Sequence, residues 1–208
     1  MSRKTLRALL IFTRNPEPGK CKTRLAAAIG DRAALNIYRF LLRHTAAISR
    51  KLRGIDKHVY FSDHPGDGSF WDPDTFQHHL QKGEDLGARM HQAFLEAFAM
   101  GYSQVVLIGS DLYNLTTEDL TASFRELDRH EVVLGPAADG GYYLIGMKRP
   151  IPGLFRGKHW GTETVLKDSL VDLKDFSTYM LPERNDVDRY EDIEGNPIFK
   201  PFLNQKES

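Results

Sequence analysis

The chain has 208 residues, and its 28 lysines and arginines balance its 28 aspartates and glutamates, so the formal net charge is zero. This balance argues against nucleic acid or an anionic membrane as a partner bound by overall charge, and it leaves only local electrostatic sites. A single cysteine excludes an internal disulfide and a cysteine-based zinc site, and no apolar stretch approaches the ~20 residues of a transmembrane helix, so we expect a cytoplasmic protein.

Short apolar runs alternate with stretches of helical periodicity along the chain. The runs predict strands over Ala8–Phe12, His58–Ser62, Val105–Ile108, Val132–Leu134, Tyr142–Met147 and Thr178–Leu181. The periodic stretches and their capping residues predict helices over Asp31–Ser49, Leu86–Ala97, Thr116–Arg129, Thr162–Leu173 and Arg189–Glu194. The alternation predicts an α/β fold with a mostly parallel, mixed central sheet and helices on both faces. No linker divides the chain, so we expect one domain over residues 1–208.

The first strand leads into a Pro/Gly loop that carries Lys20, Lys22 and Arg24. In an extended backbone these alternate side chains would share one side and converge at the carboxyl end of the strand, where open α/β sheets bind ligands. Convergent cations suit the phosphates of a nucleotide, whereas the alternative is a solvated basic loop. The loop is neither a P-loop, because Arg14 stands where that motif requires glycine, nor a G-x-G-x-x-G loop. Cys21 lies among these cations, which favour its thiolate.

Two acidic positions follow farther along the chain. Asp85 and Gly87 stand at the start of a predicted helix, where Asp85 is either the N-cap or, together with Gly87, a contact for a nucleotide. Asp111 comes directly after a buried strand, at the edge where ligands bind. Its carboxylate could hold Mg²⁺ or Mn²⁺, or it could bond the backbone of the next turn.

A glycine-containing turn and a later loop are candidates for substrate binding. Asp139 is a candidate catalytic base or acceptor for a sugar hydroxyl, while the paired glycines after it permit close approach of backbone to ligand. The alternative is a plain hairpin turn, since Asp-Gly between strands is a strong turn signal. The candidate substrate-binding residues are Gly140, Gly141, Tyr142, Trp160 and Thr162.

Two more carboxylates alternate near the end of the chain. Asp186 and Asp188 could point the same way, and both precede a predicted short helix. Asp188 is therefore a candidate metal ligand, or simply the N-cap of that helix. Histidines show no metal-ligand spacing, and no G-x-S-x-G motif indicates an α/β-hydrolase.

Together these segments resemble the bacterial DUF2064 family, the selenodomain- and arsenosugar-associated glycosyltransferases. The matching segments, in chain order, are Phe12–Leu25, Gly83–Met90, Val106–Leu115, Gly135–Gly146, Trp160–Thr162 and Asp186–Asp188. The resemblance implies a Rossmann-like GT-A fold of the nucleotide-diphospho-sugar transferase type, a nucleotide at the carboxyl edge of the sheet, and a divalent cation, Mg²⁺ or Mn²⁺. By this likeness Asp111 takes the place of the family's metal aspartate and Asp188 that of a second acid. Because Tyr113 stands where a full Asp-x-Asp would need its second aspartate, the metal site depends on Asp188.

Three functions remain open at this point. The first is a glycosyltransferase that uses a nucleotide-diphosphate sugar and a small-molecule acceptor near Asp139 and Trp160. The second is a nucleotidyltransferase that releases pyrophosphate, in which Lys22 and Arg24 stabilise charge on the triphosphate. The third is a nucleotide-binding protein without turnover. The family name favours the first, in which Lys22 and Arg24 act as catalytic residues beside Asp139, and Lys20, Asp85, Gly87 and Asp111 complete the nucleotide contacts.

Overall fold

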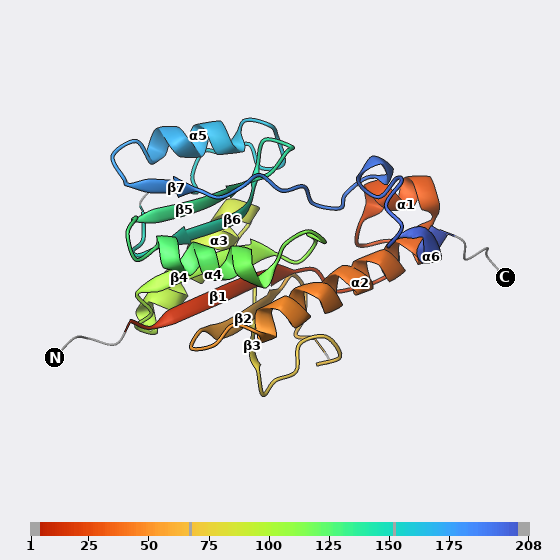
Figure 1. Cartoon of the computed structure of the whole chain (residues 1–208), viewed down its shortest axis with the longest axis horizontal. Coiled ribbons are helices and arrows are strands. Elements are labelled where there is room, and N and C mark those ends of the chain that lie inside the picture. Colours follow the sequence, from red (N-terminus) through yellow and green to blue (C-terminus); the bar gives the residue numbers. More distant parts are fainter. Residues whose placement is uncertain (1–4, 67, 152, 204–208) are drawn as a thin grey trace.

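The computed structural model describes residues 5–66, 68–151 and 153–203. Its centre is a seven-stranded sheet with the order β3-β2-β1-β4-β6-β5-β7 (Figure 1). The strands are β1 (Arg7–Thr13), β2 (Asp56–Phe61), β3 (Phe76–Leu80), β4 (Gln104–Gly109), β5 (Val132–Pro136), β6 (Tyr142–Met147) and β7 (Thr178–Met180). β6 runs antiparallel to β4 and β5, while the other paired strands are parallel. The prediction of a mixed, mostly parallel sheet is therefore confirmed.

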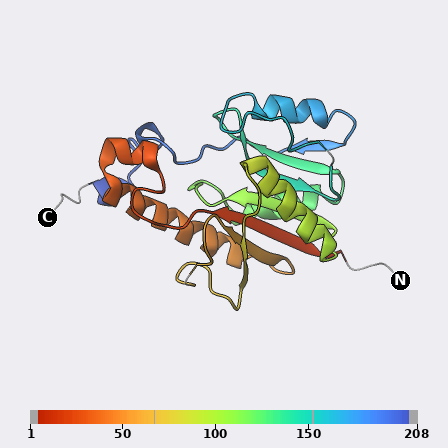
Figure 2. The same ribbon diagram turned by 180° about the vertical axis from the view of Figure 1, so that it is seen from behind.

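Helices cover both faces of the sheet, as Figures 1 and 2 show from opposite sides. They are α1 (Thr23–Ile29), α2 (Asp31–Arg50), α3 (Leu86–Ala99), α4 (Thr117–Glu126), α5 (Val165–Asp172) and α6 (Lys200–Leu203), with a 3₁₀ turn η1 (Tyr190–Asp192). Helices α2 and α4 pack with Leu9 and Ile11 of β1, and α3 and α5 pack on the opposite face, where Ala8 and Leu10 point. Burial on both faces explains why β1 is a continuous apolar run. None of the helices in the described ranges combines the length and apolar character needed to cross a membrane.

Three elements were not predicted: α1, β3 and α6. The sequence of β3 is polar, and most of its side chains are half-buried or exposed. Because β3 is an edge strand, it does not need the apolar run by which a buried strand is recognised in a sequence. Helix α2 begins at Asp31 as predicted, but Gly30 is its N-cap and no side chain caps it. The helix predicted over Thr162–Leu173 begins only at Val165, and the one predicted over Arg189–Glu194 is the short turn η1.

The segment after β7 carries the chain across the carboxyl edge of the sheet. The Arg184 N–H donates to the Pro136 carbonyl at 3.1 Å, and the Val187 N–H donates to the Asp111 carbonyl at 3.1 Å. These bonds bring the residues around 186–188 beside the loop that follows β4. The chain then lies beside α1 and the start of α2, beyond the edge of the sheet (Figure 1). The buried side chains that pack together there are Leu25, Ala34, Ile37, Leu41, Val187, Ile193 and Phe199.

A chain of hydrogen bonds links the first half of β2 to β3 and to the residues before β4. The Tyr102 hydroxyl donates to Asp56 Oδ2 at 2.8 Å, so it accepts from His58 Nε2 at 3.0 Å. His58 Nδ1 is then left to accept from His79 Nε2 at 2.9 Å. This pattern assigns a neutral tautomer to His58. Burial, with His79 nearby, lowers the pKa of His58 to about 4.

We expect the free energy of unfolding to fall as the pH is lowered from about 6.5 to about 4. In that window the unfolded chain protonates His58 whereas the folded protein keeps it neutral, so acid favours the unfolded state. The difference in pKa corresponds to roughly 3 kcal/mol at most. Denaturant titrations of the parent and of His58→Gln at both ends of the window would measure it. Equal losses in the two proteins would show that His58 is not responsible.

Candidate functional site

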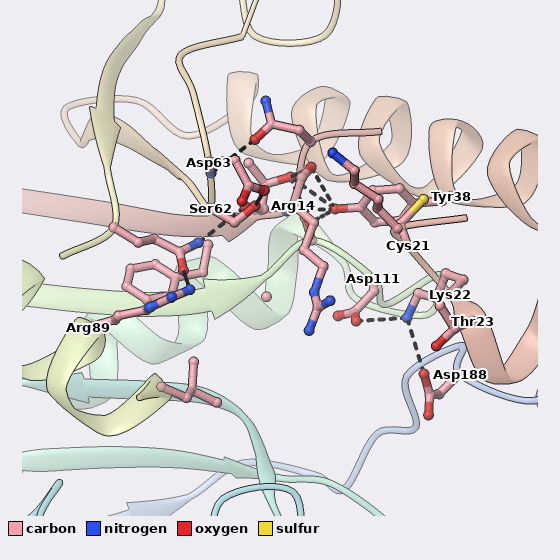
Figure 3. Close-up of a pocket in the computed structure, with 18 of the residues that line it drawn as sticks. Arg14, Cys21, Lys22, Thr23, Tyr38, Ser62, Asp63, Arg89, Asp111 and Asp188 are labelled. Carbon is pink, nitrogen blue, oxygen red and sulfur yellow. Dashed lines mark hydrogen bonds and ion pairs between the residues drawn. The ribbon is translucent and has the colours of Figure 1, made fainter. Parts of the chain in front are cut away.

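An open cavity of about 980 Å³ lies at the carboxyl ends of β1 and β4. Its walls come from the loops after β1, β2 and β4, the starts of α1 and α3, and the segment after β7 (Figure 3). The cationic side chains that line it are Arg14, Lys20, Lys22, Arg24 and Arg89. The acidic side chains are Asp63, Glu84, Asp85, Asp111 and Asp188. The cavity therefore occupies the sheet edge at which the sequence predicts ligand binding.

Two buried polar side chains fix the loop after β1. The Tyr38 hydroxyl, from α2, accepts from the Arg14 N–H at 2.9 Å and lies 3.3 Å from Ser110 Oγ, so it joins the loops after β1 and β4. Asn15 Nδ2 donates to the His64 carbonyl at 2.9 Å and so ties the same loop to the one after β2. These bonds hold the floor of the cavity in place before any ligand arrives, which lowers the entropic cost of binding.

The backbone of the cationic loop is not extended, so the predicted alternation of its side chains is wrong. Lys22 has a φ of 52°, in the left-handed region, and α1 begins directly after it, so Arg24 lies in a helical turn. Consequently the three cations separate. The Lys22 side chain is 6% exposed, whereas Lys20 and Arg24 are 71% and 62% exposed. Lys20 turns to Glu17, with 2.7 Å between Nζ and Oε2.

The Lys22 ammonium is shared by two carboxylates (Figure 3). Its Nζ lies 2.9 Å from Asp111 Oδ2 and 4.0 Å from Asp188 Oδ1, and Arg24 Nη1 lies 2.9 Å from Asp188 Oδ2. Burial alone would lower the pKa of Lys22, but Asp111, followed by more distant carboxylates, outweighs burial and raises it above its ordinary value. Lys22 is thus held as a buried positive charge at the meeting point of β1, β4 and the C-terminal segment.

The N-cap interpretation of Asp188 is wrong. The N–H groups of Asp188 and Arg189 donate to Asp192 Oδ2, at 2.8 and 2.6 Å, so Asp192 supplies the capping carboxylate for η1. The Asp188 carboxylate bonds Arg24 instead and lines the cavity. Within the described residues, the Asp111 carboxylate likewise bonds Lys22 rather than the backbone of its own turn.

Asp186 interacts electrostatically with Lys22, Asp111 and Asp188. From the sequence it was noted only as the acidic residue that alternates with Asp188. Burial, then Asp111, and more weakly Asp139 and Asp188, raise the pKa of Asp186 to about 6 against the opposing charge of Lys22. The signal that could have identified it was the Asp-x-Asp spacing itself. Negative charge therefore exceeds positive charge around the buried ammonium.

The start of α3 forms one corner of the cavity. Asp85 is the N-cap, because its Oδ1 accepts from the Ala88 N–H at 2.7 Å, and it also lines the cavity. Both interpretations of Asp85 are therefore compatible with its position. Gly87 is buried outside the cavity lining, and a Cβ there would collide with the indole of Trp160. The absence of a side chain at Gly87 thus serves the packing of Trp160.

The predicted substrate segment is a tight hairpin turn between β5 and β6. Asp139 Oδ1 accepts from the Gly141 N–H at 2.9 Å, as the turn interpretation requires. A Cβ on Gly140 would collide with the backbone of Glu163. The absence of a side chain at Gly140 therefore allows the segment that contains Glu163 to pack against the turn.

The other candidate substrate residues, Tyr142, Trp160 and Thr162, make contacts within the protein. The rings of Tyr142 and Trp160 meet edge to face at 6.4 Å against the core, and Thr162 Oγ1 donates to the His159 carbonyl at 2.7 Å. In the described chain neither Asp139 nor any candidate substrate residue lines the cavity itself. The catalytic role of Asp139 and the role of the others in binding an acceptor stay predictions.

Several cavity residues were missed by sequence reasoning. Arg14 and Asn15 lie in the same loop as the predicted cations. Arg89 lies one turn into α3, so the prediction that Asp85 at the start of this helix contacts a nucleotide could have led to it. Tyr38 lies among the buried residues of α2, and its spacing in the sequence indicates only the apolar face of that helix. Burial raises the pKa of the Cys21 thiol, so the expected thiolate is not favoured despite the nearby cations.

The chain is similar to known proteins in both sequence and fold. The model of a family described as "Uncharacterized protein conserved in bacteria (DUF2064)" matches residues 45–162. No curated protein matches the chain. A solved structure of a protein from Desulfovibrio desulfuricans G20, provisionally named a nucleotide-diphospho-sugar transferase, is 29% identical, with a TM-score of 0.84 over 96% of this chain and 94% of that one.

More distant structures share the fold. The 4-diphosphocytidyl-2C-methyl-D-erythritol synthase of Anaerococcus prevotii DSM 20548 is 10% identical, with a TM-score of 0.60 over 91% of this chain and 93% of that one. The inositol-1-phosphate CTP transferase of T. maritima is 12% identical, with a TM-score of 0.55 over 98% of each chain. The Rossmann-like fold expected from the sequence is therefore confirmed.

Proposed function

Because this chain belongs to the bacterial DUF2064 family, we propose that it is a metal-dependent glycosyltransferase that moves a sugar from a nucleotide-diphosphate sugar to a small-molecule acceptor. The observation that carries the proposal is the buried Lys22 ammonium shared by Asp111 and Asp188 in a cavity rich in cations. Support also comes from the named nucleotide-diphospho-sugar transferase of Desulfovibrio desulfuricans G20, whose likeness extends over nearly the whole chain.

In this proposal the cations bind the diphosphate of the donor. Lys22 and Arg24 contact its oxygens and stabilise the charge that develops as the diphosphate departs. Each must turn from a carboxylate to a phosphate, and both can do so locally because Arg24 is largely exposed and Lys22 opens onto the cavity. Lys20, Arg14 and Arg89 line the remaining wall, and Asp85 borders the nucleotide.

No group of three or more His, Cys, Asp or Glu side chains in the described ranges is arranged to hold a metal ion, so a divalent cation at Lys22 would need substrate oxygens besides the two carboxylates there. Asp111 and Asp188 offer hard oxygen donors and already share one positive group, and Mg²⁺ is typically held by one or two carboxylates together with substrate phosphates. Asp186 adds further negative charge nearby. Asp111 and Asp188 would hold Mg²⁺ or Mn²⁺, which would supply positive charge to neutralise phosphate oxygens, and Lys22 would then contact the substrate.

A second candidate is nucleotidyl transfer from a nucleoside triphosphate. The observation that favours it is the fold, which this chain shares over 98% of its length with the inositol-1-phosphate CTP transferase of T. maritima. The two reactions differ in their products. Release of pyrophosphate indicates nucleotidyl transfer, whereas release of a nucleoside diphosphate indicates sugar transfer.

We expect nucleotide sugars and nucleoside diphosphates to raise the melting temperature, and to raise it more with Mn²⁺ than with EDTA. A ligand that binds only the folded state stabilises it by RT ln(1 + [L]/Kd), about 2.7 kcal/mol at a hundredfold excess over Kd. Thermal-shift titrations with nucleosides as the phosphate-free control measure this. Equal shifts from nucleosides and their diphosphates would exclude a phosphate site, and shifts that ignore Mn²⁺ would exclude the metal.

Asp139→Asn should lower turnover by about 10²–10⁴-fold while nucleotide affinity changes little, because a general base acts only on the reacting proton. The asparagine keeps an Oδ1 that can accept from the Gly141 N–H, so the turn should persist. Asp175→Asn, an exposed aspartate elsewhere, is the matched control. If turnover and affinity fell together, Asp139 would be a donor-binding or structural residue.

A further inference from the structure

A second cavity, of about 540 Å³, adjoins the first across the loop after β1. The two cavities share Arg14 and Asn15 in their walls, but the second opens between α2 and the loop that follows β2. Its size falls within the range of small-molecule sites, roughly 300–1,000 Å³. The proposed transfer reaction leaves this cavity without a role.

Two arginines from one helix face give this cavity its charge. Arg39 and Arg43 lie one turn apart on α2 and both line it. Like charges at this spacing repel each other and destabilise a helix. Among the described residues no carboxylate forms an ion pair with either arginine. Glu17, the acidic residue among the described residues of the lining, already pairs with Lys20 and His64.

Aromatic rings form the wall that faces these charges. Phe61 and Trp71 are buried side chains that contribute to the lining, and Phe70 is half-buried beside them. The guanidinium of Arg43 lies over the Phe70 ring, 5.5 Å from its centroid. A cation–π contact of this kind orients the guanidinium without neutralising its charge. The cavity thus combines an apolar wall with two arginines that form no ion pair within the part of the chain that the structure describes.

We propose that this second cavity binds a small organic anion, a phosphate monoester or carboxylate that carries an aromatic or other apolar group, at a site separate from the nucleotide. The anionic group would lie between Arg39 and Arg43, whose planar forks suit bidentate contact with phosphate or carboxylate oxygens. The apolar group would pack on Phe70 and Trp71. Binding would relieve the repulsion between the two arginines.

Phenyl phosphate is the direct probe, because it joins a phosphate to a flat ring. Its binding can be followed by NMR through the indole signal of Trp71. Inorganic phosphate, which lacks the ring, and phenol, which lacks the phosphate, are the control probes. We expect phenyl phosphate to bind more tightly than either half. Benzoate, tested in parallel, separates a carboxylate site from a phosphate-ester site.

The charge requirement is tested with Arg39→Gln/Arg43→Gln. This variant should bind phenyl phosphate at least about tenfold more weakly, since a charge-assisted hydrogen bond is worth a factor of this size. The matched control, Arg32→Gln/Arg53→Gln, removes two exposed arginines that lie outside the cavity and should leave binding unchanged. If the double variant does not fold, as judged by circular dichroism, Arg43→Gln alone should still weaken binding.

Competition separates this site from the nucleotide cavity. Excess UDP should not displace phenyl phosphate, and Lys22→Met should not weaken it. The proposal is overturned if UDP displaces the probe, if the arginine variant binds as tightly as the parent, or if phenyl phosphate leaves the Trp71 signal unmoved up to roughly 10 mM, where any specific affinity would be negligible. A failure of nucleotide binding itself would leave these outcomes unaffected.

Discussion

Lys22→Met should weaken nucleoside diphosphate binding by about ten- to a hundredfold. A charge-assisted contact to phosphate contributes roughly 1.5–3 kcal/mol, and methionine keeps the volume of the side chain while it removes the charge. Turnover should fall further, by about 10²–10³-fold, because the ammonium also stabilises charge on the departing group. Affinity from calorimetry and rates from a product assay measure the two effects separately.

Lys20→Met is the matched control for this variant. Lys20 lies two residues away in the same loop, but its side chain is 71% exposed and pairs with Glu17 rather than with the carboxylates of the cluster. We expect its loss to change nucleotide affinity by less than about threefold, as for other exposed charges. Equal effects at both positions would mean that the loop acts only through its overall charge.

The fold could be predicted because its signals are local. The apolar runs of β1, β4 and β6 and the periodic face of α2 each specify one element, and the alternation of elements specifies the layers. The capping box of Thr116 and Asp119 is another local signal, and it is present at the start of α4. Strand β3 was missed because an edge strand needs few apolar residues, and its pairing with β2 becomes apparent only in the assembled sheet.

The arrangement of the cationic loop could not be predicted, because it depends on contacts between distant segments. The left-handed conformation of Lys22 brings its side chain to Asp111, which is 89 residues away in sequence. Sequence spacing alone favoured an extended backbone with three cations that converge on one side. The structure instead divides them into one buried ammonium, one exposed guanidinium on Asp188, and one lysine paired with Glu17.

The approach of Asp188 to Asp111 depends on the path of the chain after β7. The bond from the Val187 N–H to the Asp111 carbonyl sets the C-terminal segment beside the loop after β4. Nothing in the spacing of Asp186 and Asp188 specifies that contact, and it was the family resemblance that paired Asp188 with Asp111. Local patterns therefore identified the residues, while long-range pairing determined which of them meet.

Asp111→Asn should lower the free energy of unfolding by about 3 kcal/mol. The change leaves the buried Lys22 ammonium without its nearest carboxylate, and breaking a buried ion pair from one side costs roughly 3–5 kcal/mol. The lower figure applies because the Asp111 side chain is 32% exposed. The double variant Lys22→Met/Asp111→Asn should recover part of this loss, since it removes the uncompensated charge as well, and denaturant titrations of the four proteins give the coupling energy.

The same variant tests the metal independently of stability. If Asp111 holds the divalent cation with Asp188, the extra thermal shift that Mn²⁺ gives with UDP should disappear in Asp111→Asn, because an amide is a much poorer ligand for a hard cation than a carboxylate. Asp63→Asn, which changes another exposed aspartate of the cavity lining, should keep that shift. A loss of stability with an unchanged Mn²⁺ effect would make Asp111 a partner for Lys22 alone. Lys22 would then remain the positive group between Asp111 and Asp188 at every stage of the reaction. The reaction would rely on Lys22 and Arg24 without a metal.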